Sequence, residues 1–329
     1  MSEQASLSKA SVVIRTLNES RHLPDLLRGI QRQHSPGLDI ETVLVDSGST
    51  DGTLEIAAEF GARIVQIHKD DFSFGRSLNY GCDAATGQAL VMVSGHCIPV
   101  DEHWISRLLA PLGRDGIVYT YGGQRGNEAT RYSERRIFAK YFPEDDHLPQ
   151  HGFFCNNANS ALLKSVWVKY PFDEQLTGLE DMHLAKQLVD AGHRIGYVAG
   201  AAVLHLHDET WAQVRRRFER EAIALQRIMP EVHLTRADVA RFFLGAALHD
   251  FGSALNDRCF RRKAAEIISY RFMQFTGAYR GNHSQRLKAS EMKEQYFYPN
   301  RKAQSQLDRG NQDGQWKKAH HRAAADEGK

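Results

Sequence analysis

The sequence predicts an α/β fold in which a mostly parallel central sheet carries helices on both faces and is followed by a helical C-terminal extension. Apolar, strand-like runs alternate with amphipathic helical stretches in the first part of the chain, and this alternation is typical of parallel sheets. Polar and glycine-containing segments directly follow the strand-like runs. From Thr210 the sequence is helical and basic up to Tyr279.

The first elements are expected where the apolar pattern changes its period. The strand-like runs occupy residues 11–15, 41–46, 63–67 and 89–94. Between the first two, apolar side chains recur at helical spacing, at Leu23, Leu26, Leu27 and Ile30. A short helix is predicted from Thr53 to Phe60, with Gly61 in the position of a C-terminal cap.

The second half of the chain begins less regularly. Residues 122–164 are expected to be rich in loops, and a helix then begins near Glu180 and ends at Gly192. Extended segments are expected at 195–198 and 203–207. The predicted domains are a flexible N-terminus (1–9), an α/β domain (10–230), a helical subdomain (231–300) and a tail poor in apolar residues that is expected to be disordered (301–329).

Composition restricts the class of protein. The 329 residues carry a formal net charge of +2, which gives no reason to expect nucleic acid as a partner. Four cysteines lie far apart, at Cys82, Cys97, Cys155 and Cys259, and such spacing fits a reducing compartment better than a disulfide framework. The N-terminus lacks the apolar core of a signal peptide and no apolar run is long enough to span a bilayer. We therefore expect a cytoplasmic protein, with peripheral contact to the inner membrane as an option.

Polar residues follow successive strands at the points where those strands end. Because parallel strands meet at one rim, the loops that begin at Thr16, Asp46, His68 and Ser94 are expected to share it. The segments 15–19 (Arg-Thr-Leu-Asn-Glu) and 46–53 (Asp-Ser-Gly-Ser-Thr-Asp-Gly-Thr) could hold a base and a ribose. Capping of the next helix by Ser49 or Asp51 is the alternative.

These segments resemble the opening motifs of family 2 glycosyltransferases, which have the GT-A fold. The resemblance extends over residues 10–220 and is greatest to the rhamnosyltransferase-like branch. Further matching segments follow in the family's order: 74–81, 87–99, Trp104, Tyr121-Gly-Gly-Gln124, Gly178-Leu-Glu-Asp181 and His205-Leu-His207. The resemblance implies a nucleotide-diphosphate-sugar donor, bound by Thr16, Asn18, Glu19, Asp46, Ser47, Ser49, Asp51, Arg76, Asn79, Ser94 and Gly95.

The family usually has Asp-x-Asp at the end of the fourth strand, where it binds Mn²⁺ or Mg²⁺, but this chain has Ser94-Gly95-His96. His96 could replace the second aspartate as a metal ligand, although imidazole suits Mg²⁺ poorly. The metal could instead be held by His205 or His207, which alternate along an extended segment and should point the same way. A third option is a metal-free site in which histidine and arginine stabilise the leaving group.

Glu180 and Asp181 precede a predicted helix. Carboxylates at a helix N-terminus are stabilised by the helix dipole, which would suffice to explain one of them. The resemblance implies that Asp181 is the catalytic base for the acceptor hydroxyl, and that Glu180 orients the loop or binds the acceptor. It also implies a single displacement that inverts the anomeric centre.

The acceptor side is expected in segment 151–159, which mixes aromatic rings with amides. The candidate acceptor-binding residues are Trp104, Asn156, Asn157 and Asn159; a loop held together by its asparagines is the alternative. Residues 239–275 carry apolar side chains at helical spacing among basic ones. They predict either a packed helical subdomain or a helix lying on the membrane surface near a lipid-linked acceptor.

The sequence therefore predicts an inverting glycosyltransferase that extends a glycan or lipid-linked glycan, as in bacterial surface polysaccharide biosynthesis. Two alternatives stay open. A catalytically silent nucleotide-sugar-binding scaffold is favoured by the missing Asp-x-Asp and opposed by the Glu180-Asp181 pair. A sugar-phosphate nucleotidyltransferase would need an early glycine-rich loop with a basic residue, which the sequence lacks.

Overall fold

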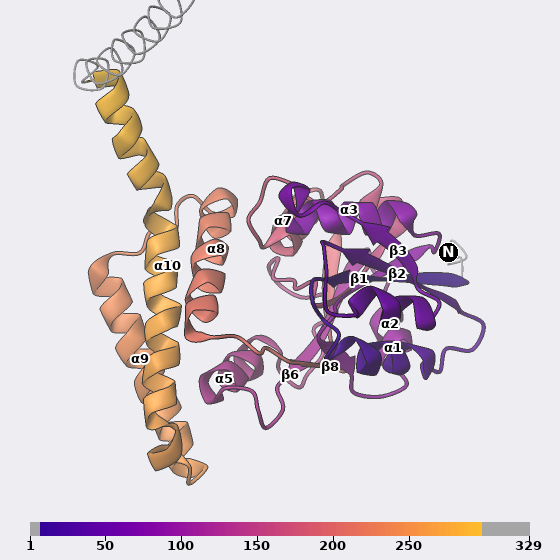
Figure 1. Ribbon diagram of the computed structural model, residues 1–329, viewed down its shortest axis with the longest axis horizontal. Helices are drawn as coiled ribbons and strands as arrows, with labels where there is room; N and C mark the ends of the chain where they lie inside the picture. The colour runs from indigo at the N-terminus through magenta and orange to yellow at the C-terminus, as the bar shows by residue number, and fades with distance from the viewer. Residues whose placement is uncertain (1–6, 298–329) are drawn as a thin grey trace, which may run out of the picture. The chain divides into compact units, whose positions relative to one another are not determined.

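The computed structural model describes residues 7–297, and a single eight-stranded sheet organises them (Figure 1). The strand order is β3-β2-β1-β4-β7-β6-β8-β5. The strands are β1 (Lys9–Thr16), β2 (Asp39–Asp46), β3 (Arg63–Gln66), β4 (Ala89–Ser94), β5 (Cys97–Pro99), β6 (Ile117–Arg125), β7 (Asn159–Leu163) and β8 (Arg194–His205).

The helices that precede residue 200 cover the two faces of this sheet. They are α1 (Leu23–Gln31), α2 (Thr53–Glu59), α3 (Phe74–Ala84), α4 (Trp104–Leu109), α5 (Tyr132–Tyr141), α6 (Lys164–Trp167) and α7 (Glu180–Asp190), with a 3₁₀ turn at Lys69–Asp71. Figure 1 shows α1 and α2 on one side of β1–β3 and α3 and α7 on the other. Val12 and Ile14 lie in the apolar core that includes Leu26 of α1, and Val13 lies in the core that includes Leu78 of α3. The predicted sheet with helices on both faces is confirmed.

Parallel pairing brings the polar strand ends together. Strands β3, β2, β1 and β4 are parallel neighbours, and Thr16 pairs with Asp46 while Arg15 pairs with Ser94. Strand β7 then runs antiparallel between β4 and β6, and β8 is parallel to β6. The expected common rim of polar loops is thus present at the carboxyl ends of β1, β2 and β4.

Two details differ from the predicted order. Residues 122–164 are rich in loops, as expected, but they also include the end of β6, all of α5 and all of β7. The apolar pattern did not predict helix α5, because its buried face includes Ser133 and Glu134, which are held by polar contacts. The extended segments at 195–198 and 203–207 are one continuous strand up to His205.

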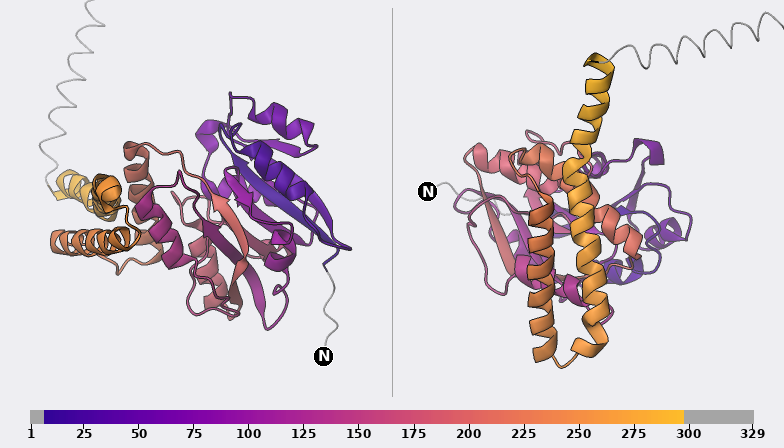
Figure 2. Two further views of the ribbon diagram at one scale, coloured as in Figure 1. Left: turned by 90° about the horizontal axis from the view of Figure 1, so that it is seen from below. Right: turned by 90° about the vertical axis from the view of Figure 1, so that its left-hand side faces the viewer.

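Three longer helices follow the sheet: α8 (Trp211–Ile228), α9 (Arg236–Asn256) and α10 (Phe260–Phe297). Capping boxes begin α8 at Thr210 and α9 at Thr235. In both views of Figure 2, α9 and the first part of α10 lie side by side. Buried Asp250 joins them to α5, since it accepts from Arg271 Nε at 2.8 Å and from Ser133 Oγ at 2.7 Å.

Residues up to Gly281 form one compact unit, and Asn282 begins a second, of which residues 282–297 continue α10. The domain boundary near residue 230 stays a prediction, and the tail at 301–329 lies outside the described residues. Within residues 7–297, none of the helices is long and apolar enough to cross a bilayer.

Asn159 is a buried junction between α4, β6 and β8. Its Oδ1 accepts from Trp104 Nε1 at 2.7 Å, and its Nδ2 donates to the carbonyls of Gly123 (3.0 Å) and Ala201 (2.8 Å). Asn159→Ala would leave three buried polar groups without these partners. We expect the free energy of unfolding, measured with urea, to fall by about 3 kcal/mol or more. Exposed Asn256→Ala is the control and should change it by less than about 0.5 kcal/mol; equal effects of the two variants would contradict this role.

Candidate active site

A cleft of about 540 Å³ opens at the carboxyl ends of the strands. We call it the strand-end cleft. Its walls come from the loops after β1, β4 and β8, from the start of α7 and from one face of α8. The described side chains in it are mostly charged or imidazole groups, including Glu19, His96, Glu180, Asp181 and Arg220. Such a lining suits a charged, strongly polar ligand rather than an apolar one.

The loops after β1 and β2 are held together by the residues that sequence analysis assigned to the nucleotide. Buried Asp46 accepts from the backbone amides of Gly48 and Ser49, both at 2.9 Å, and from Thr16 Oγ1 at 3.2 Å. The backbone N–H of Asn18 donates to Ser49 Oγ at 2.8 Å. Asn18 itself has a φ of 57°, a left-handed conformation that asparagine tolerates better than most residues. These contacts fix the shape of the loop.

Asp51 holds the neighbouring loops together, although it is not the N-cap of α2, which is Gly52 without a side-chain cap bond. It accepts from the Ser20 amide at 3.0 Å and from Thr53 Oγ1 at 2.5 Å. Burial raises the pKa of Asp51, but the bonds from Thr53 and Ser20 outweigh it and hold that pKa at about 2. Ser47 is likewise turned inward, with its Oγ donating to the Thr16 carbonyl at 3.2 Å. Neither side chain lines the strand-end cleft, whereas Asn18, Glu19 and Ser94 do.

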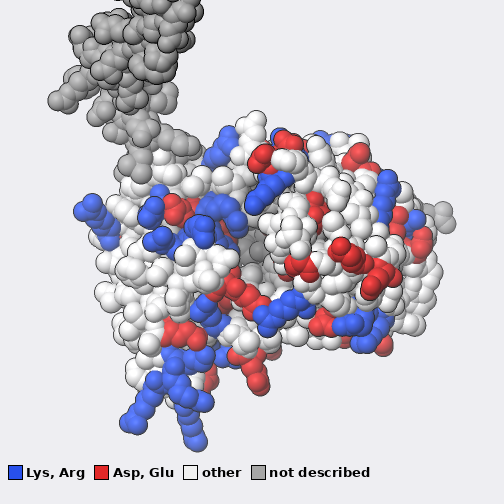
Figure 3. All heavy atoms as spheres, viewed as in Figure 1, with Lys and Arg blue, Asp and Glu red and all other residues white. Residues whose placement is uncertain are grey.

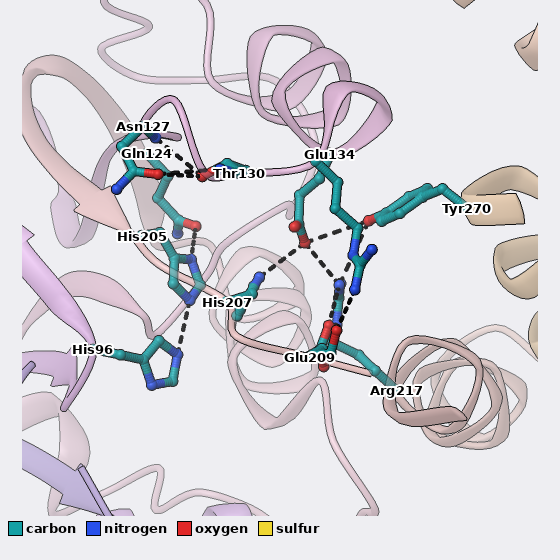
Figure 4. Close-up of polar contacts among 11 residues, drawn as sticks. His96, Gln124, Asn127, Thr130, Glu134, His205, His207, Glu209, Arg217 and Tyr270 are labelled. Atoms are coloured by element: carbon teal, nitrogen blue, oxygen red, sulfur yellow. Dashed lines mark hydrogen bonds and ion pairs between the residues drawn. The ribbon is translucent and has the colours of Figure 1, made fainter. Parts of the chain in front are cut away.

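Three histidines from two chain segments meet in the strand-end cleft (Figure 4). His96 follows β4, His205 ends β8 and His207 lies two residues further. The Nε2 atoms of His96 and His205 are 3.2 Å apart, and the ring centroids of His205 and His207 are separated by 4.1 Å. The three can present nitrogen atoms that all lie within 4.8 Å of one another. The extended backbone thus turns His205 and His207 the same way, as expected.

The partners of these imidazoles determine which nitrogen carries the proton. Each ring has an oxygen acceptor at Nδ1: Glu19 Oε1 for His96 (2.7 Å), Gln124 Oε1 for His205 (2.7 Å) and Glu134 Oε1 for His207 (2.8 Å). Each Nδ1 therefore donates, so the neutral ring keeps its lone pair on Nε2. Burial lowers the pKa of both His205 and His207 and favours their neutral forms. Neutral imidazoles oriented by outer hydrogen bonds are characteristic of metal ligands.

Glu134 connects this cluster to the C-terminal helices. Its carboxylate also accepts from Arg217 Nη2 at 2.8 Å, and Arg217 forms a second ion pair with Glu209 at 2.8 Å. Burial raises the pKa of Glu134, but His207 and Arg217 outweigh it and the net shift is downward. Figure 4 shows this series of polar contacts, which runs from His207 through Glu134 to Tyr270 on α10. The sequence did not predict a site role for Glu134 or Glu209. Arg217 was expected only as part of the helical, basic segment that begins at Thr210.

The acidic pair at the start of α7 faces the same cleft. Asp181 Oδ2 accepts from the Asn157 amide at 2.8 Å, and Glu180 forms an ion pair with Arg15 at 3.0 Å. Burial, together with the neighbouring charge of Glu180, raises the pKa of Asp181 to about 7. The cap residue Leu179 has a φ of 56°, a costly conformation for a non-glycine residue that is often found at functional sites. Helix-dipole stabilisation alone does not account for this arrangement.

Arginine side chains cover the opposite flank of the acidic pair. The guanidinium carbons of Arg15 and Arg220 lie 5.0 and 4.3 Å from the ring centroid of Phe74, and all three residues line the strand-end cleft. The buried Arg220 Nε has no hydrogen-bond partner among the described residues. An unpaired donor of this kind in a polar cleft is available to an anionic ligand.

Several predicted site residues are placed elsewhere by the structure. Trp104 and Asn159 are fully buried and bonded to one another, so neither can contact an acceptor. Asn157 is also buried, whereas Asn156 does line the strand-end cleft. Arg76 and Asn79 both bind Glu174, at 2.8 and 3.0 Å, and lie outside the cleft lining. Gly95 lies beneath Glu19, where an added Cβ would come within 2.9 Å of Glu19 Cγ.

Residues 11–169 match the family model described as glycosyl transferase family 2. The chain therefore contains a glycosyltransferase family 2 domain. The glycosyltransferase AglE of Haloferax volcanii is 25% identical over 204 residues, which cover 59% of this chain and 65% of AglE. The O-antigen chain rhamnosyltransferase RfbN of Salmonella typhimurium is 25% identical over 225 residues, covering 64% of this chain and 70% of RfbN.

Solved structures agree on the fold of this family 2 glycosyltransferase. The mannosyltransferase PcManGT of Pyrobaculum calidifontis, solved with GDP-Man and Mn²⁺, superimposes with a TM-score of 0.59 at 14% sequence identity. The match covers 83% of this chain and 86% of the mannosyltransferase. The GT-A fold and the C-terminal helical extension expected from the sequence are therefore confirmed.

The raised pKa of Asp181 makes a prediction about stability. A carboxyl whose pKa rises on folding from 3.8 to about 7 binds more protons in the folded state, so its ionisation destabilises the fold as pH rises through 7. Asp181→Asn should therefore unfold at a higher urea concentration than the unmodified protein at alkaline pH, with the difference shrinking as pH falls below 7. Exposed Asp83→Asn is the matched control, for which we expect no such pH-dependent gain. A pH-independent difference for Asp181→Asn would exclude a raised pKa.

Proposed function

We propose that this family 2 glycosyltransferase transfers a sugar from a nucleotide-diphosphate donor to an acceptor hydroxyl with inversion of the anomeric centre. One observation carries the proposal: the buried carboxylate of Asp181 shares the strand-end cleft with three converging imidazoles and with arginines that include Arg15 and Arg220. A base, a cation-binding group and anion-binding groups are the parts that such a transfer needs. The alternative of a silent scaffold does not explain why an acidic pair is buried beside them.

Asp181 is suited to the role of catalytic base. A pKa of about 7 leaves the carboxylate able both to exist ionised and to accept a proton at neutral pH. The acceptor oxygen forms a bond to the anomeric carbon while its proton moves to Asp181. On the other side of that carbon, the bond to the diphosphate oxygen breaks and the nucleoside diphosphate leaves. Glu180, held by Arg15 at 3.0 Å, positions the loop that presents Asp181.

His96, His205 and His207 fit a divalent metal, because their Nε2 lone pairs converge and their Nδ1 protons are fixed by outer acceptors. Such a metal, when bound, would supply positive charge for the departing diphosphate. Three imidazoles favour Mn²⁺ and softer ions over Mg²⁺. The sequence left open a metal held by His96, a metal held by His205 or His207, and a metal-free site; a site shared by all three histidines combines the first two.

The arginines of the cleft complete the leaving-group site. Arg220 offers an unpaired Nε, and guanidinium groups bind phosphate oxygens in pairs of hydrogen bonds. Because Arg220 belongs to α8, the basic run at 215–220 has at least one member turned toward the cleft rather than to solvent. We assign Arg220 to the donor diphosphate.

The relatives support a general class of donor and acceptor. PcManGT was solved with GDP-Man and Mn²⁺, and RfbN is named for the transfer of rhamnose to an O-antigen chain. We propose a hexose or deoxyhexose donor and a glycan or lipid-linked glycan acceptor, as in surface polysaccharide biosynthesis. The cytoplasmic location expected from the sequence belongs to the same proposal.

The metal assignment predicts an order of affinities. Calorimetric titration of the metal-free protein should show tighter binding of Zn²⁺ than of Mn²⁺, and tighter binding of Mn²⁺ than of Mg²⁺. His96→Ala removes one of three ligands and should weaken Mn²⁺ binding at least about tenfold. His103→Ala, at a partly exposed position outside the strand-end cleft, is the control and should bind Mn²⁺ like the unmodified protein. Unchanged Mn²⁺ affinity in His96→Ala would remove His96 from the ligand set.

The base assignment predicts a separation of binding from turnover. Asp181→Asn should lower kcat at least about 100-fold, because an alcohol attacks slowly when nothing accepts its proton. Calorimetric affinity for the donor should be retained. The donor is first identified from a panel of nucleotide-diphosphate sugars that includes GDP-mannose and UDP-glucose, scored by hydrolysis or transfer.

Asp190→Asn, at the other end of α7, serves as the control for this experiment and should keep normal turnover. Normal kcat in Asp181→Asn would exclude Asp181 as the base. If the unmodified protein binds a donor but neither hydrolyses nor transfers its sugar, the silent scaffold becomes the better explanation.

A further inference from the structure

A second cleft, which shares no lining residue with the strand-end cleft, lies among α5, α9 and the first part of α10. Its volume is about 1010 Å³, and we call it the basic cleft. Four of its lining residues are the cations Arg136, Lys140, Arg241 and Arg271, and among the described residues none of those lining it is acidic. A concave surface lined by charge of one sign attracts the opposite charge more strongly than a flat one does.

Two of these four cations, Arg136 and Lys140, have no carboxylate partner among the described residues, whereas Arg241 and Arg271 have one each. Arg271 is paired, since it binds Asp250 at 2.8 Å. By contrast, the buried Arg136 Nε has no hydrogen-bond partner among the described residues. Lys140 lies 5.3 Å from the ring centroid of Tyr141, whereas Arg241 contacts Asp238 at 3.5 Å and lies 4.8 Å from the ring centroid of Phe242. Arg136 and Lys140 are therefore available to an anion, and the exposed, weak ion pair of Arg241 can be exchanged for one.

The same helices expose large apolar side chains beside the basic cleft. Phe242 and Phe275 stack at its wall, with ring centroids 6.5 Å apart. Exposed apolar residues continue along both helices, at Leu244, Leu248, Leu255, Ile268 and Phe272. Exposure of this many large apolar groups on two neighbouring helices indicates an interaction surface.

Basic side chains also gather at the turn between the two helices, where Arg258, Arg261 and Arg262 are exposed. Figure 3 shows Lys and Arg side chains at this lower end of the α9–α10 hairpin, below a largely uncharged surface. The α9–α10 hairpin, residues 236–281, thus combines exposed apolar groups with unpaired cations. This is the chemistry of a surface that lies on an anionic bilayer.

We propose that the α9–α10 hairpin docks on a membrane of anionic phospholipid, with a lipid phosphate bound in the basic cleft. Exposed leucine and phenylalanine side chains enter the headgroup boundary, while Arg136, Lys140 and Arg241 surround the phosphate. A soluble phosphate ester would use the cations but leave the apolar residues exposed. A second copy of the hairpin would cover the apolar residues but bring like charges together.

The test is flotation of the full chain with vesicles of phosphatidylcholine, with and without phosphatidylglycerol. We expect binding only to the vesicles that contain phosphatidylglycerol, and less of it at high salt. Each Lys or Arg near such a surface contributes about a fivefold change in partitioning, so Arg136→Gln with Arg241→Gln should lower binding about 25-fold. The matched control is Arg32→Gln with Arg114→Gln, which removes the same charge from exposed positions elsewhere and should bind normally.

A second variant tests the apolar contribution without disturbing the core. Leu248→Ser with Phe272→Ser changes two exposed side chains and should also weaken flotation, with the urea unfolding curve unchanged. The proposal is overturned if phosphatidylglycerol does not increase the flotation of the unmodified chain. It is equally overturned if the Arg136→Gln, Arg241→Gln variant floats to the same extent as its charge-matched control. It is also overturned if glycerol phosphate binds the cleft while vesicles do not, or if sedimentation shows a dimer that the Leu248→Ser, Phe272→Ser variant loses. Vesicle binding does not depend on turnover, so this test is independent of the proposed glycosyl transfer.

Discussion

The arrangement of the candidate active site depends on one constraint: three imidazoles must turn the same nitrogen toward a common point. Two Nε2 atoms only 3.2 Å apart cannot both carry protons without repulsion. Glu19, Gln124 and Glu134 accept the Nδ1 protons, and the facing Nε2 lone pairs, which would otherwise repel each other, are left for a shared proton or cation. Since these acceptors come from the loop after β1, from β6 and from α5, the constraint ties distant parts of the chain to one place.

Parallel-strand geometry explains how much of this site could be predicted from sequence. Polar residues that directly follow apolar strands must meet at one rim. The sequence therefore predicted that the loops carrying Glu19, Ser94 and His96 lie together, and all three residues line the strand-end cleft. Alternation along an extended segment likewise placed His205 beside His207. The fold class followed from the same patterns, since helices on both faces bury each strand on both sides.

The remaining residues could not be predicted because their roles depend on partners far away in the sequence. Glu134 reads as one more charged residue on a helix, and only Arg217 and His207, more than 70 positions later, make it a buried acceptor. Trp104 and Asn159 are residue types that bind sugars, yet they bond to each other inside the core. Residue type alone does not distinguish a surface that binds a ligand from a polar pair that is buried.

The active site extends well beyond the segment by which the family is identified. That segment ends at residue 169, whereas Asp181, His205, His207 and Arg220 all follow it. A hybrid enzyme joined at residue 169 would inherit the loops after β1 and β2 from one parent, and Asp181, the proposed base, with two of the three imidazoles from the other. Interchange of specificities between relatives therefore requires a junction after α8, so that Glu134 and Arg217 remain from the same parent.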